Sequence, residues 1–146
     1  MLASTAKTVT LVSFACLVFN LSVLAESRSP RTVVRRAAQS WISFLDEGRY
    51  VEAWDSFSEE KKKQLTQEDW LNGFDVAMRK SLGKPQQRKI MYLEIDKSNL
   101  NKAQVNFGGS FERRPGVGIF ESLSLVRNSL GEWMVSDYSC RVVPRM

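Results

Sequence analysis

The sequence predicts an α+β protein in which N-terminal helices pack on a curved, four-stranded antiparallel sheet, and two observations support this fold class. Apolar residues recur at helical spacing between residues 32 and 82 and alternate with a period of two after Pro85. The alternating segments are joined by short connections that contain no helix. Parallel βαβ units are therefore excluded, and an antiparallel sheet is expected.

The first predicted helix begins at Thr32, which can cap it, and ends at Gly48, which can adopt the left-handed conformation common after helices. Its apolar stripe consists of Val34, Ala38, Trp41 and Leu45. A second, shorter helix follows directly, and its stripe consists of Tyr50, Ala53, Trp54 and Phe57. The tight junction at Gly48 is expected to bring Trp41 and Trp54 towards a common core.

The charged segment 59–63 (EEKKK) follows Ser58, and its acids precede its bases. This order matches a helix dipole, so we expect a solvated helical turn here and not a basic patch. A third helix is predicted from Thr66, which forms a variant capping box with Asp69, to Leu82. Gly73 in its middle would cost up to about 1 kcal/mol relative to alanine, which suggests that another backbone approaches closely there.

The strands are predicted from alternation and from turn residues. Gly108 and Gly109 indicate a bulge or bend of the kind that a curved sheet needs, and residues 113–116 (RRPG) indicate a turn. Met91 and Leu93 are expected on the same face of the first strand. The expected strands cover residues 90–95, 103–111, 119–126 and 133–140.

Residues 1–25 have the three-part pattern of a secretory signal: a positive start at Lys7, an apolar stretch, and small residues at Val23 and Ala25. We expect cleavage after Ala25 and an exported protein, periplasmic or secreted, with a flexible lead at 26–31 and a single domain at 32–146. A membrane anchor fits less well, because it needs about 20 apolar residues and this stretch is interrupted. Lipidation at Cys16 fits least well.

The composition excludes several kinds of chemistry. The chain contains no histidine, so histidine-based triads, bases and metal ligands are excluded. Its two cysteines are Cys16, inside the signal, and Cys140. The mature chain therefore has one thiol and no internal disulfide, and we expect Cys140 to be a packed apolar residue. We expect no metal and no cofactor.

Spaced aromatic and glycine motifs carry a resemblance over about residues 33–141. They are AAQSW (37–41), DEGRY (46–50), Trp54, Trp70, Arg79, Leu82-Gly83, Arg88-Lys89 and GEWMV (131–135). Through them the chain resembles the domain-of-unknown-function family numbered 4019, which comprises small exported bacterial proteins. The resemblance implies a cystatin-like or nuclear-transport-factor-2-like cone with an apolar pocket between helices and sheet. It implies no catalytic residues, because the family has no assigned reaction.

A carboxylate on an apolar strand face would suit acid–base chemistry, because burial raises the pKa of a carboxyl group. Glu121 shares strand parity with Ile119 and Leu123, and Asp137 shares parity with Val135. Steroid-isomerase-type members of the cone superfamily combine such a base with tyrosine donors and no metal. In the alternative interpretation, Glu121 lies at the rim of the sheet beside an arginine or lysine. A one-residue slip would also reverse the parity.

Aromatic residues supply the other candidates for ligand binding. Trp54 and Trp70 either line a pocket or pack in the core, and Tyr92 and Tyr138 can present hydroxyl groups. The full set expected to bind a ligand is Trp54, Trp70, Tyr92, Glu121 and Tyr138.

The net charge of +5 falls to +4 once Lys7 is lost with the signal. Export and the scatter of the basic residues argue against nucleic-acid binding. Arg79, Lys80, Lys84, Arg88 and Lys89 form the one local concentration, for which weak attraction to an anionic surface is the more plausible use.

Three hypotheses for function follow. The first, which we prefer, is an exported non-enzymatic module that binds a small ligand, a peptide or a partner protein. The second is a metal-free isomerase-like or dehydratase-like enzyme that uses Glu121 or Asp137. The third is an interaction domain that forms a homodimer through its outer sheet face.

Overall fold

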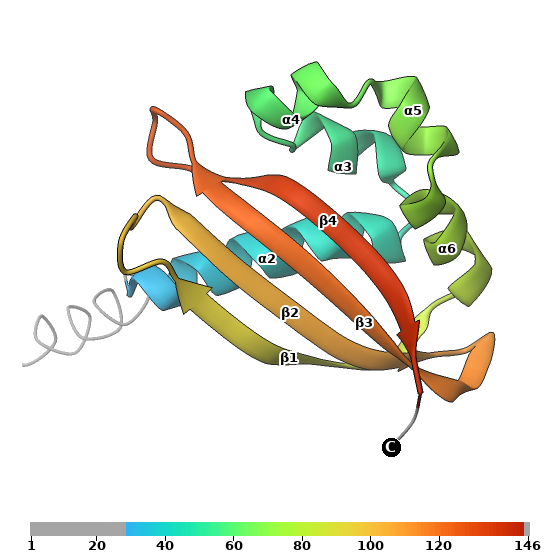
Figure 1. The fold of residues 1–146 in the computed structure, drawn as a ribbon. Helices are drawn as coiled ribbons and strands as arrows, with labels where there is room; N and C mark the ends of the chain where they lie inside the picture. The colour runs from blue at the N-terminus through green and yellow to red at the C-terminus, as the bar shows by residue number, and fades with distance from the viewer. Residues whose placement is uncertain (1–28, 145–146) are drawn as a thin grey trace, which may run out of the picture.

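The computed structural model describes residues 29–144, and it confirms the predicted fold class. Helices come first in the chain, and one four-stranded antiparallel sheet follows with the strand order β1-β2-β3-β4. Helix α2 lies along one face of the sheet, and the shorter helices gather beyond β4 (Figure 1). The predicted signal at 1–25 and the first part of the predicted lead lie outside the described residues.

Helix α2 (Pro30–Asp46) begins two residues before the predicted start. Ser29, and not Thr32, is the N-cap residue, because Pro30 occupies the first turn, where its fixed φ suits a helix and its missing N–H is not needed. Gly48 has a φ of 73° and terminates the helix region as predicted. The predicted stripe is buried, together with Ile42.

Four short helices follow: α3 (Tyr50–Asp55), α4 (Glu59–Gln64), α5 (Gln67–Asn72) and α6 (Phe74–Leu82). Helix α4 buries no residue and is capped by Ser58, which confirms the solvated turn. The prediction of one helix from Thr66 to Leu82 was wrong, because Gly73 is extended and separates α5 from α6. A Cβ at Gly73 would lie 2.9 Å from the Asp69 carbonyl oxygen, so the closely approaching backbone is that of α5 itself.

The strands are longer than predicted. They are β1 (Pro85–Ile95), β2 (Lys102–Phe111), β3 (Arg114–Arg127) and β4 (Trp133–Val143). The predicted turn at 113–116 was wrong, since the connection consists of Glu112 and Arg113 only and the following proline and glycine belong to β3. Proline is tolerated close to the beginning of a strand, where it disturbs the ladder least.

Two irregularities reverse the predicted side-chain parity. The β1–β2 register shifts between Ile90 and Tyr92, so Met91 is 65% exposed although Leu93 is buried. The β3–β4 register shifts beside Leu125, and as a result Val135 and Tyr138 are both buried. Each shift inserts one residue into a strand, which turns every later side chain to the opposite face.

The core lies between α2 and the inner face of the sheet. At its centre four aromatic rings are in contact, with centroid separations of 5.0 to 6.2 Å: Trp41, Phe57, Trp70 and Tyr138. The segment before α4 extends the sheet at β4, where the Ser58 N–H donates to the Val135 carbonyl at 2.8 Å. No described helix covers the outer face of the sheet (Figure 1).

Candidate functional site

Glu121 is the most deeply buried carboxylate of the described residues, with 1% of its surface exposed. It lies on the inner face of β3 between Ile119 and Leu123, both buried, so its predicted parity was correct. The alternative of a rim position was wrong, although the basic partner that it assumed is present.

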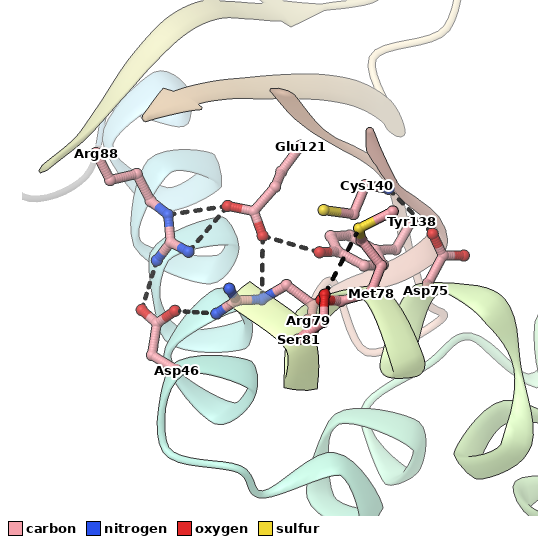
Figure 2. A network of polar contacts seen from close by, with 9 residues as sticks. All are labelled: Asp46, Asp75, Met78, Arg79, Ser81, Arg88, Glu121, Tyr138 and Cys140. Atoms are coloured by element: carbon pink, nitrogen blue, oxygen red, sulfur yellow. Dashed lines mark hydrogen bonds and ion pairs between the residues drawn. The ribbon is translucent and has the colours of Figure 1, made fainter. Parts of the chain in front are cut away.

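Two arginines and a tyrosine bind the Glu121 carboxylate (Figure 2). Arg88 from β1 donates through Nε to Oε2 at 3.0 Å, and Arg79 from α6 places its Nε 3.4 Å from Oε1. Tyr138 donates its hydroxyl to Oε1 at 2.8 Å. Both carboxylate oxygens are therefore engaged by side chains of the protein itself.

Asp46, the last residue of α2, closes this network from the helix side. Arg79 Nη2 donates to its Oδ1 and Arg88 Nη1 donates to its Oδ2. Both guanidinium groups also lie over the ring of Phe111, at 4.6 and 5.4 Å from its centroid. Two positive and two negative charges thus balance inside the protein, as buried charges require.

The ionisation of the groups around Glu121 suits a structural network. Burial and the nearby Glu121 charge raise the pKa of Tyr138 well above its ordinary value, so this tyrosine stays a hydrogen-bond donor. Burial, again with Glu121, raises the pKa of Cys140 from 9.0 to about 12. A thiol that remains protonated is a poor nucleophile, which agrees with the predicted packing role. For Arg88, hydrogen bonds and charge from Asp46 and Glu121 outweigh burial and raise its pKa.

The arrangement offers little for catalysis. A general base needs a free oxygen facing a substrate, and Glu121 lines none of the hollows described below. Among residues 29–144, no group of three or more acidic, cysteine or histidine side chains is placed to hold a metal ion. None of the helices in this part of the chain is long and apolar enough to span a membrane.

Asp137, the other predicted base, does not lie on the inner face. The bulge in β4 turns it outward, where its side chain is 61% exposed and Oδ1 pairs with Lys61 Nζ at 2.6 Å. The predicted parity with Val135 was therefore wrong. An exposed carboxylate that is already paired with a lysine is not held against an apolar pocket in which a substrate could meet it.

The aromatic candidates are dispersed over the molecule. Trp70 is buried in the core and donates through Nε1 to the Tyr50 carbonyl at 2.8 Å, and half-buried Trp54 donates to the Leu65 carbonyl at 3.1 Å. Tyr92 is 44% exposed on the opposite side of the sheet and contacts Glu94. The structure brings only Glu121, Tyr138 and the neighbouring Trp70 together among the five predicted residues.

The space between the helices and the sheet is largely filled by side chains. A small hollow of about 230 Å³ remains between the short helices and β4, and Trp70 and Tyr138 are part of its lining. A second hollow of about 790 Å³ lies near the β1–β2 hairpin, but its lining mixes acids, lysines and serines. Neither is the deep apolar pocket that the resemblance implied.

The most apolar hollow lies on the outer face of the sheet, and the sequence analysis missed it. This outer-face hollow has a volume of about 690 Å³ and is lined mainly by apolar residues and glycines, among them Met91, Gly108, Gly118, Phe120 and Val143. Ligand sites typically enclose about 300–1,000 Å³ and have a predominantly apolar lining. From the sequence, this face was expected to act only as a homodimer interface, in the third hypothesis.

Glycines shape this hollow. A Cβ on Gly108 would lie 3.0 Å from Met91 Cγ, and a Cβ on Gly118 would lie 3.0 Å from Val143 Cγ2. Because these two Cβ atoms are missing, the Met91 and Val143 side chains can lie against the neighbouring strands. The sequence signal for this hollow is the glycine pair at 108–109, which by itself predicts only a bulge or bend.

Comparisons with known proteins concern the family and the fold. The profile of a family described as "Protein of unknown function (DUF4019)" matches residues 37–138. A solved structure from Catenulispora acidiphila is similar to this chain, with 16% sequence identity over 85% of this chain and 94% of the other and a TM-score of 0.48. No curated protein is significantly similar in sequence.

Proposed function

Because this chain belongs to the DUF4019 family of unknown function, we propose that it is an exported, non-enzymatic module that binds a small apolar ligand in its outer-face hollow. The observation that carries the proposal is the contrast between the two faces of the sheet. The inner face buries the Glu121 carboxylate among the protein's own cations, and the outer face presents an open apolar hollow.

Export is part of this proposal and rests on the sequence. The apolar stretch that ends at Val23 and Ala25 has the form of a cleaved signal. A periplasmic or secreted binding module fits a chain whose single mature thiol is buried and unreactive. We also assign the fold to the cystatin-like or nuclear-transport-factor-2-like cones, on the order of helices followed by a curved sheet.

The enzyme hypothesis is less well supported. It needs a carboxylate that can accept a proton from a bound substrate, and Glu121 already accepts from Arg88 and Tyr138. Asp137 lies in water beside Lys61. A binding role requires no such group.

A neutral fluorescent probe tests the proposal directly. The full chain is expressed, its exported form is purified, and N-phenyl-1-naphthylamine is titrated into it. We expect saturable fluorescence enhancement with one site per chain. Met91→Glu places a charge in the hollow at a residue that is already exposed, so the fold is preserved and the probe affinity should fall at least ten-fold.

Leu130→Glu is the matched control, because Leu130 is 81% exposed in the β3–β4 loop and does not line the hollow. It should leave probe binding unchanged. Absence of saturable binding by the parent, or equal affinity for parent and Met91→Glu, would contradict the proposed function.

A further inference from the structure

Among the described residues, those that line or border the outer-face hollow carry charge of one sign only. Lys89 is exposed and belongs to its lining, and the Arg141 guanidinium lies 4.6 Å from the centroid of the ring of Phe120, another lining residue. No aspartate or glutamate is among the residues that line it. The hollow is therefore an apolar surface bordered by two cations.

These two cations have no anionic partner within the described residues. The two buried arginines on the inner side of the sheet, Arg79 and Arg88, are by contrast paired with Asp46 and Glu121. In residues 29–144 no ion pair involves Lys89 or Arg141. A cation beside an apolar surface attracts a ligand that combines an apolar body with an anionic head.

We propose that the hollow binds a free long-chain carboxylate, with the alkyl chain over Met91, Phe120 and Val143 and the carboxylate beside Lys89 and Arg141. This inference rests on the proposed function and names its ligand class. The chain's excess of positive charge favours approach of such an anion. Arginine is also suited to hold a carboxylate through two parallel N–H donors.

The alkyl chain and the charge make separable contributions to affinity. An alkyl chain supplies most of the affinity, because each methylene that it removes from water adds a favourable contribution. The carboxylate adds selectivity, because exposed ion pairs contribute modestly and are weakened by salt. We expect dodecanoate to bind about five- to ten-fold more tightly than dodecanol, and this ratio should shrink as ionic strength rises.

The experiment is a displacement assay. Bound N-phenyl-1-naphthylamine is displaced by dodecanoate, dodecanol or dodecylammonium, each below its micelle concentration. The double variant Lys89→Gln/Arg141→Gln should lose the preference for dodecanoate over dodecanol. The ratio of the two affinities is the readout, because a change in the shape of the hollow alters both ligands alike. The control Arg36→Gln/Lys63→Gln removes two exposed cations elsewhere and should keep that preference. Any affinity tag belongs directly after Ala25, because Pro144 lines the hollow and a tag placed before the signal would be removed with it.

The outcomes separate the inference from the proposed function. Failure of the neutral probe to bind overturns both. Probe binding with equal affinity for dodecanoate and dodecanol, or a dodecanoate preference that survives in the double variant, overturns only the carboxylate assignment. If the protein binds phosphatidylglycerol vesicles but not monomeric dodecanoate, the carboxylate assignment is also overturned. The outer face then binds a membrane surface. If the protein forms a dimer and binds the probe only after the dimer dissociates on dilution, the carboxylate assignment is overturned. The outer face is then an interface with a second copy of this chain.

Discussion

Replacement of Glu121 by glutamine tests whether the buried network stabilises the fold. Glu121→Gln keeps the shape of the side chain but removes one of two negative charges that face Arg79 and Arg88. Both arginines then share Asp46 alone, and one positive charge lies uncompensated in the core. Removal of one partner from a buried ion pair typically costs about 3–5 kcal/mol. Against a total stability of about 5–15 kcal/mol, that loss is large.

Urea denaturation, followed by tryptophan fluorescence at neutral pH, measures this loss. If unfolding changes by about 2 kcal/mol per molar urea, the midpoint should fall by roughly 2 M. Glu60→Gln is the matched control, because Glu60 is exposed in α4 and makes no ion pair within the described residues. It should change the free energy of unfolding by less than about 0.5 kcal/mol.

A double-mutant cycle separates the ion pair from general packing. Glu121→Gln/Arg88→Gln removes one charge of each sign and leaves Arg79 with Asp46. The double variant should be less destabilised than the sum of the two single variants, by about 1–3 kcal/mol. A Glu121→Gln protein at least as stable as the parent would refute the reasoning. It would indicate that the buried Glu121 charge destabilises the fold, as charges kept for a function can do.

Four further predictions concern other parts of the chain. Trp41→Ala should lower the free energy of unfolding by about 3–5 kcal/mol, because this buried ring contacts three other aromatic rings; a melting midpoint near that of the parent would contradict its core role. The Cys140 thiol, whose pKa is raised to about 12, should not react with Ellman's reagent at pH 8 until the protein unfolds, and rapid reaction of the native protein would be the contrary result. Above pH 9 the unfolded thiol ionises and the folded one does not, so the parent should lose stability relative to Cys140→Ala as the pH rises towards 12. The exported protein should have the intact mass of residues 26–146, and a mass that retains the first 25 residues, or a lipid adduct on Cys16, would contradict cleavage after Ala25.

Periodicity predicted the parts of this fold that follow from burial alone. The stripe of α2 and the inward direction of Glu121 are consequences of periods of 3.6 and 2, which hold wherever an element is regular. Periodicity failed at Met91 and Asp137, since a bulge adds a single residue and leaves no compositional mark. It failed again at Gly73, where a glycine ended one helix and began another.

The site was predictable only in part, because its members are distant in the sequence. Parity identified Glu121, but nothing along the chain pairs it with Arg79 or Arg88, which lie 42 and 33 positions before it. The two arginines belong to what we interpreted as one basic concentration with a surface role. That interpretation was wrong for Arg79 and Arg88, whose side chains are only 1% and 13% exposed.

The adjacent residues Arg88 and Lys89 connect the two faces of the sheet. Successive side chains of a strand point to opposite faces, so Arg88 enters the buried network and Lys89 borders the outer-face hollow. The inner position suits an arginine, because only a planar fork can bind Asp46 and Glu121 at once while stacking on Phe111. The outer position suits a lysine, whose compact, well-hydrated charge can stay in water until an anion arrives. The network therefore fixes the position of the strand whose next residue faces the proposed ligand, which gives a non-catalytic reason for placing four charges in the core.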